Sequence, residues 1–509
     1  MRTIDANTQE FRARDGAITA ARDSELRVIE PGTNCWRIDR ADRAAVLIDG
    51  AAYFAALESS LRKAKRSIVI LGWDFDPRIR LRPHLAESES PQLGALLRSL
   101  VEERPDLQIH VLVWSLSLVC TPDQLTRRLV GENWAKHPRI TVRFDGRHPP
   151  YAAHHQKVVC VDGAVAYSGG IDLTTGRWDT PGHHASDPAR VDPCGKPCTP
   201  VHDVQIVVDG EAARSMAALV SARWSRATGA RLPHAGAFGS DRWPDGVAPQ
   251  FRDIGVAIAR TQPAIQGKPE VREVEALTLD AIRAARQSIY IEAQYMTAAR
   301  IGDEIERHLT ARTGPEIVVV MSRAAPGRLE RWAMSGNRDR LIRRLARADK
   351  YGRLRICYPT VARRNGPKPL HVHSKVVIVD DVLLRVGSSN LNNRSMGLDT
   401  ECDLAIEARN AGERAAITSI RDTLLAEHLG VSPKIVRRAS AGGRIARAVD
   451  LLNAPGRGLV PFKAMTDHGP STPGILTPII DPERPFLASL KARLQGTPMK
   501  ARPSLAPAE

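Results

Sequence analysis

Aromatic residues are scarce in this chain of 509 residues and make up only 5% of it. That scarcity disfavours the long base-stacking platform that proteins use to bind single-stranded nucleic acid. Long apolar runs are missing too, because no stretch approaches the roughly 18 uninterrupted apolar residues of a membrane-spanning helix. The first thirty residues hold no apolar segment of signal-peptide length. We therefore expect a cytoplasmic or peripheral membrane protein, and any export would have to use a route without a signal peptide.

Cysteines and acidic residues are also few. Seven cysteines, an odd number, give no sign of a disulfide framework. Cys194 and Cys198 share a loop with His183, His184 and His202, but their spacing matches no standard zinc site, and a Pro/Gly-rich surface loop is the simpler interpretation. The 57 acidic residues against 73 basic ones leave a net charge of +16. This excess favours an anionic partner such as a phospholipid surface, nucleic acid or a phosphorylated substrate, unless it serves solubility alone.

The chain repeats itself once. Residues 54–77 resemble residues 277–298, and in both an amphipathic helical pattern leads into an apolar strand. The closest similarity is between 154–173 and 371–391. Strands that alternate with amphipathic helices predict an α/β fold, here two similar α/β/α units with mixed sheets and pseudo-two-fold symmetry.

The repeat and the composition divide the chain into five parts. The predicted parts are an N-terminal extension (1–40), a first unit (41–228), a Gly/Pro-rich linker (229–250), a second unit (251–430) and a basic, then Pro-rich C-terminal tail (431–509).

Both units carry one motif, His-x-Lys-x4-Asp-x6-Gly-Gly/Ser-x-Asp/Asn. The first copy is His155, Lys157, Asp162, Gly169, Gly170 and Asp172, and the second is His373, Lys375, Asp380, Gly387, Ser388 and Asn390. One such triplet alone is weak evidence, but two at equivalent positions of a repeat exclude coincidence.

The motif has a chemical logic. His and Lys lie two apart in an apolar strand pattern, so their side chains leave the same face. Two such strands, one from each unit, would bring two imidazoles and two ammonium groups to one point. This set suits a phosphodiester, because the lysines neutralise its oxygens while one imidazole attacks phosphorus and the other protonates the leaving oxygen, then activates the acceptor. Since Lys supplies the positive charge, we expect no metal and no other cofactor in the reaction.

The remaining motif residues divide into two groups. The glycines would let backbone N–H groups approach the phosphate, with Ser388 and Asn390 as further donors, and Gly170 and Asp172 are the equivalent positions in the first unit. Asp162 and Asp380 lie five residues after their lysines and so point to the opposite face. We expect them to be structural motif members that make no contact with substrate.

These residues make the chain resemble the phospholipase D superfamily, whose signature is the duplicated H-x-K-x4-D. The resemblance covers most of residues 35–430 and is closest to the single-chain, phosphatidylcholine-hydrolysing phospholipases D of the eukaryotic type, which also occur in bacteria. It is carried by "HH" (154–155), "GGIDLTTGRWD" (169–179), "HD" (202–203) and "GSSNLNNRSMGLDTECDLAI" (387–406). "IEAQYM" (291–296) is similar to a family strand, except that Ala293 replaces the usual Asn.

The resemblance implies a role for each site residue. His155 would form the covalent phosphohistidine and His373 would be general acid and base, with the reverse order as the alternative. Lys157, Lys375, Ser388 and Asn390 would hold the phosphate. Family members orient each imidazole with a carboxylate placed after the motif. Asp203 and Asp403 occupy matching positions of the repeat, and Glu401 is the alternative in the second unit.

The activity implied is that of a phospholipase D, which converts phosphatidylcholine and water to phosphatidic acid and free head group. An alcohol that intercepts the phosphoenzyme would exchange the head group, a transphosphatidylation. The alternatives are a cardiolipin synthase-like phosphatidyltransferase, a metal-independent nuclease and a catalytically dead binding scaffold. We expect a phospholipid substrate at a membrane surface, no nucleic-acid partner, and a monomer.

Overall fold

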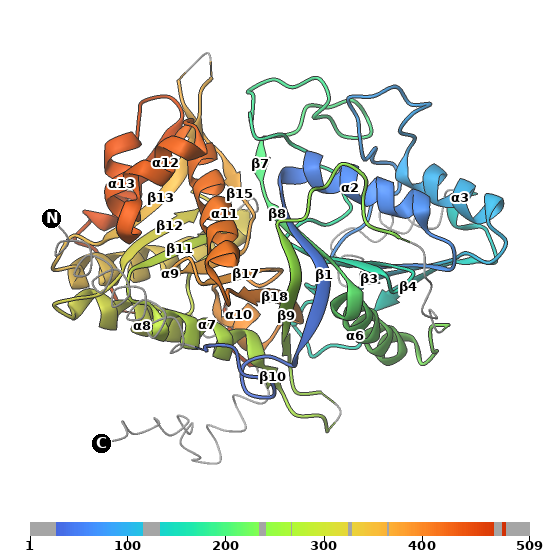
Figure 1. Cartoon of the computed structure of the whole chain (residues 1–509), viewed down its shortest axis with the longest axis horizontal. Helices are drawn as coiled ribbons and strands as arrows, with labels where there is room; N and C mark the ends of the chain where they lie inside the picture. Colours follow the sequence, from blue (N-terminus) through green and yellow to red (C-terminus); the bar gives the residue numbers. More distant parts are fainter. Residues whose placement is uncertain are drawn as a thin grey trace, which may run out of the picture.

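Two similar halves share one twisted sheet (Figure 1). The computed structural model describes residues 27–115, 133–233, 241–265, 267–323, 328–363, 366–472 and 481–484. Within these residues, no helix is both long enough and apolar enough to cross a membrane.

The first half forms a mixed sheet in the order β1-β8-β6-β5-β2-β3-β4, in which β2, β3 and β4 run parallel and the other pairs are antiparallel. Its elements are β1 (Arg37–Ile48), α2 (Asp49–Lys63), β2 (Ser67–Gly72), α3 (Leu93–Glu103), β3 (Gln108–Trp114), the short 3-10 turn η1 (Asn133–Ala135), β4 (Ile140–Asp145), β5 (Val158–Val161), β6 (Val165–Gly169), β7 (Val201–His202), β8 (Val204–Asp209) and α6 (Gly210–Thr228).

The second half repeats that order as β9-β18-β17-β16-β11-β12-β13, with the parallel strands in the same places. Its elements are β9 (Phe251–Gln262), β10 (Val271–Arg272), α7 (Glu273–Ala284), β11 (Ser288–Ala293), α8 (Ala299–Thr310), β12 (Glu316–Met321), α9 (Arg328–Ala348), β13 (Leu354–Val361), β14 (Lys368–Pro369), β15 (His371–Val372), β16 (Val376–Val379), β17 (Leu383–Gly387), α10 (Asn393–Gly397), β18 (Glu401–Glu407) and α11 (Ala411–Leu429).

The two halves join edge to edge. β1 pairs antiparallel with β9, from Arg37 opposite Ile258 to Ala44 opposite Phe251. Antiparallel pairing of equivalent strands is what a two-fold axis between the halves requires. The pseudo-two-fold α/β arrangement expected from the repeat is therefore confirmed.

Helices cover both faces of the sheet, as its strand patterns require. Alternate residues of β2 point to opposite faces, so Ile68 and Ile70 pack with α2 and α3, while Val69 and Leu71 pack on the side of α6. The core on that second side is continuous across the halves and includes residues of both α6 and α11. In the second half, α7, α8 and α9 cover the opposite face. This shared core fixes the position of one half's motif relative to the other's.

Part of the segment expected as a C-terminal tail is built into the second half. It forms α12 (Pro433–Ala439), a short 3-10 turn η2 (Ala441–Gly443), α13 (Ile445–Leu452), β19 (Gly458–Pro461) and a turn η3 (Lys463–Met465). β19 pairs antiparallel with β13, and Val436, Ile445 and Val449 enter the core. Apolar residues spaced along the basic helices supply this packing. Most of the Pro-rich end lies outside the described residues.

Candidate active site

Each motif lies at the junction of the two halves. His155 and Lys157 stand just ahead of β5, and His373 and Lys375 just ahead of β16, so the segment expected to be strand begins only after the lysine. The backbone N–H of His155 donates to the carbonyl of Thr400 (3.1 Å), and that of His373 to the carbonyl of His202 (2.8 Å). Each motif is thus hydrogen-bonded to the opposite half. The two motifs meet because the halves exchange these contacts.

Both imidazoles are held by a carboxylate from the opposite half. Nδ1 of His155 lies 3.0 Å from Oε2 and 3.1 Å from Oε1 of Glu401. Nδ1 of His373 lies 2.7 Å from Oδ2 of Asp203. A carboxylate on Nδ1 favours the tautomer with its proton there, which leaves the Nε2 lone pair free. Each histidine is therefore set up to attack or to carry a proton through Nε2.

Asp403 lies elsewhere than expected. Its carboxylate pairs with the buried Arg385 at 3.0 Å and accepts the backbone N–H groups of Ser388 and Ser389 at 3.0 and 3.1 Å. Residues two apart on a strand share a face, so Glu401 reaches toward the site from the same face of β18. Asp403 thus braces the turn after β17, and the orienting carboxylate of the second half is Glu401.

The two lysines are buried beside the imidazoles. Nζ of Lys157 lies 3.0 Å from Oδ2 of Asp172 and donates to the carbonyl of His155 at 3.1 Å. Nζ of Lys375 donates to the carbonyl of His373. Burial lowers the pKa of Lys375 to about 7, with Lys157 and Arg177 adding to the effect against Asp203. A bound anion would reverse this penalty, so the pair is suited to hold one.

Burial also governs the acids and bases. It lowers the pKa of His155 well below its usual value, and Lys157 and Lys375 add to that effect. The pKa of His373 is also lowered, mainly by burial and then by the charge of Lys375. Burial raises the pKa of Glu401 to about 7. Both imidazoles are accordingly neutral near neutral pH, and an anionic substrate is what would raise their pKa.

The predicted phosphate-binding residues have mixed surroundings. Asp172 neutralises Lys157 and accepts the backbone N–H of Trp73 at 2.8 Å, so it positions a cation. Ser388 donates its hydroxyl to Oε2 of Glu401 at 2.6 Å. Oδ1 of Asn390 is buried and has no hydrogen-bond partner among the described residues. Of these, Asn390 has an acceptor left unpaired by the described residues, which suits a donor group of a ligand and not a phosphate oxygen.

The motif glycines make room for carboxylates. A Cβ on Gly170 would lie 2.0 Å from Oδ1 of Asp203, and one on Gly387 would lie 2.0 Å from Oδ1 of Asp403. Any side chain at Gly170 would displace the group that holds His373. Glycine is therefore required at both positions because a carboxylate lies against the backbone there, whereas the sequence predicted only a need to approach phosphate.

Asp162 and Asp380 end the two motif strands in equivalent ways. The carboxylate of Asp162 accepts the backbone N–H groups of residues 65–67, each at 2.8 Å, and Nε of Arg242 at 2.6 Å. That of Asp380 accepts those of residues 286–288 at 2.7–2.8 Å. Both brace the turn ahead of a neighbouring strand, which is the structural role that their spacing predicts.

Asp162→Asn is expected to lower the free energy of unfolding by about 3–5 kcal/mol, because it breaks a buried ion pair and replaces one accepting oxygen by an amide nitrogen that faces backbone N–H groups. Asp380→Asn should cost about 1–3 kcal/mol, since the contacts described above include no such guanidinium. Urea denaturation checks both, with the exposed Asp106→Asn as control. Loss of activity with an unchanged free energy of unfolding would contradict the structural role.

Sequence reasoning missed Arg177. Its charge acts on Asp203, His371, His373 and Lys375, so it is a further cation that acts on His373. It lies seven residues after Gly170 in "GGIDLTTGRWD" (169–179), the only signal that the sequence offered.

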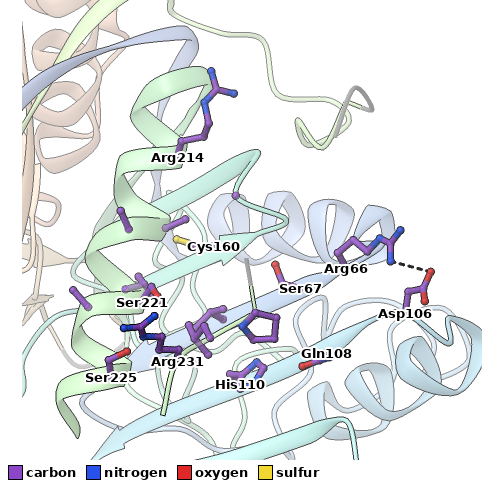
Figure 2. A pocket seen from close by; sticks show the side chains of 18 residues that line it. Arg66, Ser67, Asp106, Gln108, His110, Cys160, Arg214, Ser221, Ser225 and Arg231 are labelled. Carbon is purple, nitrogen blue, oxygen red and sulfur yellow. Dashed lines mark ion pairs between the residues drawn. The ribbon is translucent and has the colours of Figure 1, made fainter. Parts of the chain in front are cut away.

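A hollow of about 680 Å³ lies away from this site, beside α6 and strands β2 and β3 (Figure 2). Its lining includes the ion pair of Arg66 with Asp106, together with His110, Arg214 and Arg231. It contains no His, Lys or Asp of either motif. The chemistry-bearing groups therefore gather at the junction of the halves and not in this hollow.

Comparison with known proteins agrees with the geometry. A family model described as "Phospholipase D" matches residues 60–238, and one described as "Cardiolipin synthase, PLD-like domain" matches residues 278–418. The chain belongs to the phospholipase D superfamily. The two models match one half each, in agreement with the repeat.

Curated relatives of this superfamily are much longer than the matched region. The chain is 25% identical to phospholipase D A of Dictyostelium discoideum, over 79% of this chain and 37% of that protein. It is 22% identical to phospholipase D gamma 2 of Arabidopsis thaliana, over 74% of this chain and 61% of that protein. The chain thus spans about a third to three fifths of these two relatives.

A solved structure shares the fold. The phosphatidylserine synthase of Haemophilus influenzae Rd KW20 matches 77% of this chain and 89% of its own, with a TM-score of 0.50 and 15% sequence identity. At that identity the likeness concerns the fold alone.

Proposed function

We propose that this protein is a phospholipase D that hydrolyses phosphatidylcholine-type phospholipids to phosphatidic acid and a head-group alcohol through a phosphohistidine. The observation that carries the proposal is the pair of imidazoles, each held through Nδ1 by a buried carboxylate of the opposite half, beside two buried lysines. The two curated relatives described above, both phospholipases D, support the substrate class.

The first half-reaction transfers the phosphatidyl group to the protein. The Nε2 lone pair of His155 attacks phosphorus, and the bond from phosphorus to the head-group oxygen breaks. That oxygen takes the proton that Nε2 of His373 acquires when the anionic substrate binds and raises its pKa, and the free alcohol leaves. Lys157, Lys375 and Arg177 offset the charge of the phosphate oxygens. Glu401 stabilises the positive charge that develops on the His155 ring.

The second half-reaction releases the product. His373, now neutral, takes a proton from water, and the resulting hydroxide attacks phosphorus. The bond from phosphorus to Nε2 of His155 breaks, and phosphatidic acid leaves with both histidines restored. An alcohol in place of water gives the transphosphatidylation product by the same steps.

The second candidate is a phosphatidyltransferase whose acceptor is an alcohol or another lipid. The family model for residues 278–418 carries the name cardiolipin synthase, and the solved structure with the same fold is a phosphatidylserine synthase. Both candidates use the same phosphoenzyme and differ only in the acceptor of the second step. The acceptor therefore decides between them.

Vesicles of phosphatidylcholine or phosphatidylglycerol separate the candidates. We expect phosphatidic acid from the phosphatidylcholine vesicles, and phosphatidylethanol when ethanol is added. A chelator present only during the assay tests whether free metal is needed. Cardiolipin from the phosphatidylglycerol vesicles, without phosphatidic acid from either lipid, would favour the transferase. Cleavage of plasmid DNA with both lipids untouched would overturn the proposal in favour of a nuclease.

The pH dependence of kcat/KM should be bell-shaped, because it reports groups of the free enzyme. On the acid side it falls as His155 takes up a proton and loses its lone pair, which happens below the usual pKa of histidine. On the alkaline side it falls above about 7 as Lys375 loses its charge. A soluble p-nitrophenyl phosphodiester allows this measurement without vesicles.

The variant Lys375→Arg should turn over more slowly. Because a guanidinium stays charged to higher pH than this lysine does, the alkaline limb of its kcat/KM profile should move to higher pH. A wild-type profile that rises steadily above neutral pH would contradict this role of Lys375.

The burial of three tryptophans indicates which of them is placed to contact lipid. Trp178 and Trp243 are buried in the core of the first half. Trp73 is only partly buried, stacks on Trp114 with ring centroids 5.6 Å apart, and donates its backbone N–H to Asp172. We propose Trp73 as the aromatic residue nearest the head group, on a protein that meets the membrane peripherally as a monomer.

A further inference from the structure

A second cluster of titratable side chains lies directly behind Asp203, and the proposed reaction does not use it. It consists of Asp49 at the start of α2, His183 in the loop before β7, His202 in β7 and Glu427 in α11. One side-chain atom from each lies within 4.8 Å of those from the other three. All four residues are buried. Three come from the first half and Glu427 comes from the second.

Both imidazoles of this cluster are oriented from outside it. Nδ1 of His183 lies 2.9 Å from the carboxylate of Asp179, and Nε2 of His202 lies 2.9 Å from the carboxylate of Glu292. If these nitrogens carry the protons, the other two, Nε2 of His183 and Nδ1 of His202, present lone pairs to the centre. Histidines that bind metal ions in proteins characteristically have their second nitrogen held in this way.

The distances between the side-chain atoms that face one another fit a small ion. Nδ1 of His202 lies 2.7 Å from Oε1 of Glu427 and 3.1 Å from Oδ1 of Asp49. Nε2 of His183 lies 2.9 Å from Oε1 of Glu427 and 3.7 Å from Oδ2 of Asp49. A tetrahedral ion with bonds of about 2.0–2.1 Å places its ligand atoms about 3.3 Å apart. The four separations straddle that value.

The cluster also contains polar atoms with no hydrogen bond. Among the described residues, neither carboxylate oxygen of Asp49 has a hydrogen-bond partner, and Nδ1 of His202 has none either. Asp49 and His202 are both fully buried. A buried carboxylate without a hydrogen bond is costly, and an ion at the centre of the cluster would satisfy one oxygen of Asp49 and Nδ1 of His202.

We propose that Asp49, His183, His202 and Glu427 bind a divalent transition-metal ion, with zinc as the first choice. Two imidazole nitrogens and two carboxylate oxygens in a tetrahedral arrangement suit zinc, whereas calcium takes oxygen ligands in larger number. With four protein ligands, no position is open for substrate, which is typical of a structural site.

Such an ion would stabilise the backbone next to Asp203, the residue that orients His373. The backbone N–H of Asp49 donates to the carbonyl of Asp203 at 2.8 Å, and the carbonyl of His202 accepts from His373. The ligands therefore lie one residue from the carboxylate that orients His373, and Glu427 ties them to the second half. The ion would fix the junction of the halves without touching phosphate.

Protons compete with a metal ion for the ring nitrogens of this cluster. Burial lowers the pKa of His183, but Asp49, Asp179 and Glu427 outweigh it and raise that pKa to about 9. The negative surroundings that attract protons also attract a metal ion, so metal content has to be measured directly.

The test is elemental analysis of the full chain, purified without chelator and without a histidine tag. We expect about one equivalent of zinc or another transition metal per chain after gel filtration. After the metal is stripped, adding Zn²⁺ should raise the melting temperature. Adding Co²⁺ should give the visible absorption of a tetrahedral site. These readouts do not depend on activity.

Variants locate the ion. His183→Gln and Glu427→Gln should each lose the metal and the thermal response to Zn²⁺. The double variant Cys194→Ser/Cys198→Ser is the control and should keep both, since Cys194 is exposed in the same loop. Wild-type protein without metal, whose melting temperature and spectrum ignore Zn²⁺ and Co²⁺, would overturn the proposal. Metal that is lost from the cysteine variant but kept by the other two would also overturn it.

Discussion

Replacing His155 by alanine is expected to reduce turnover of a phospholipid by roughly 10⁴- to 10⁶-fold, the range seen when an enzyme loses its nucleophile. The imidazole supplies the only lone pair that the proposed first step uses, and Glu401 can stabilise no charge once the ring is gone. His373→Ala should be as severe with natural substrates, because a head-group alkoxide cannot leave without a proton.

A substrate with a good leaving group separates the two histidines. With a p-nitrophenyl phosphodiester the leaving oxygen needs no proton, so His373→Ala should still release a burst of nitrophenolate of about one equivalent per site. His155→Ala should release none. The reverse pattern would exchange the roles of the two residues, and near-normal turnover by His155→Ala would contradict the mechanism altogether.

Glu401→Gln and Asp203→Asn are expected to lower kcat by roughly 10²- to 10⁴-fold while the protein stays folded. An amide in place of the carboxylate removes the negative charge that stabilises the imidazolium, and it can present an N–H to Nδ1, which would favour the wrong tautomer. In Glu401→Gln the substitution lies in one half and its effect in the other, because Glu401 of the second half holds His155 of the first.

Asp403→Asn is the matched control. Asp403 is buried like Asp203 and occupies the same place in the repeat, but its carboxylate pairs with Arg385. This variant should lose stability in urea denaturation and yet keep kcat per folded molecule within about tenfold. If Asp403→Asn lost as much kcat as Glu401→Gln at equal folding, the assignment of the orienting carboxylates would be wrong.

The sequence was sufficient for the fold class and for recognising the repeated motif. Helix and strand periodicities, repeated twice, predicted two α/β units, and the two His-x-Lys pairs marked where they meet. The structural role of Asp162 and Asp380 followed from their distance along the strand. The basic composition of the predicted C-terminal tail did not show which of its apolar positions pack on the second half.

Contacts between the halves could not be predicted from one copy of the motif. The repeat aligns Asp403 with Asp203, yet Glu401 is the residue at the imidazole, because a longer side chain two positions earlier reaches from the same face of β18. Likewise, nothing in the spacing showed that His155 is held from the second half and His373 from the first. Gly170 was expected near phosphate, while its close neighbour is the carboxylate of Asp203.

The central claim is that His155 carries the phosphatidyl group between the two half-reactions. Rapid mixing with a short-chain phosphatidylcholine, an alkaline quench that preserves the phosphorus–nitrogen bond, and peptide mass spectrometry test it most directly. We predict a phosphatidyl adduct on the peptide that contains His155, absent from His155→Ala protein. An adduct on His373, or turnover with no adduct on any histidine, would contradict the claim.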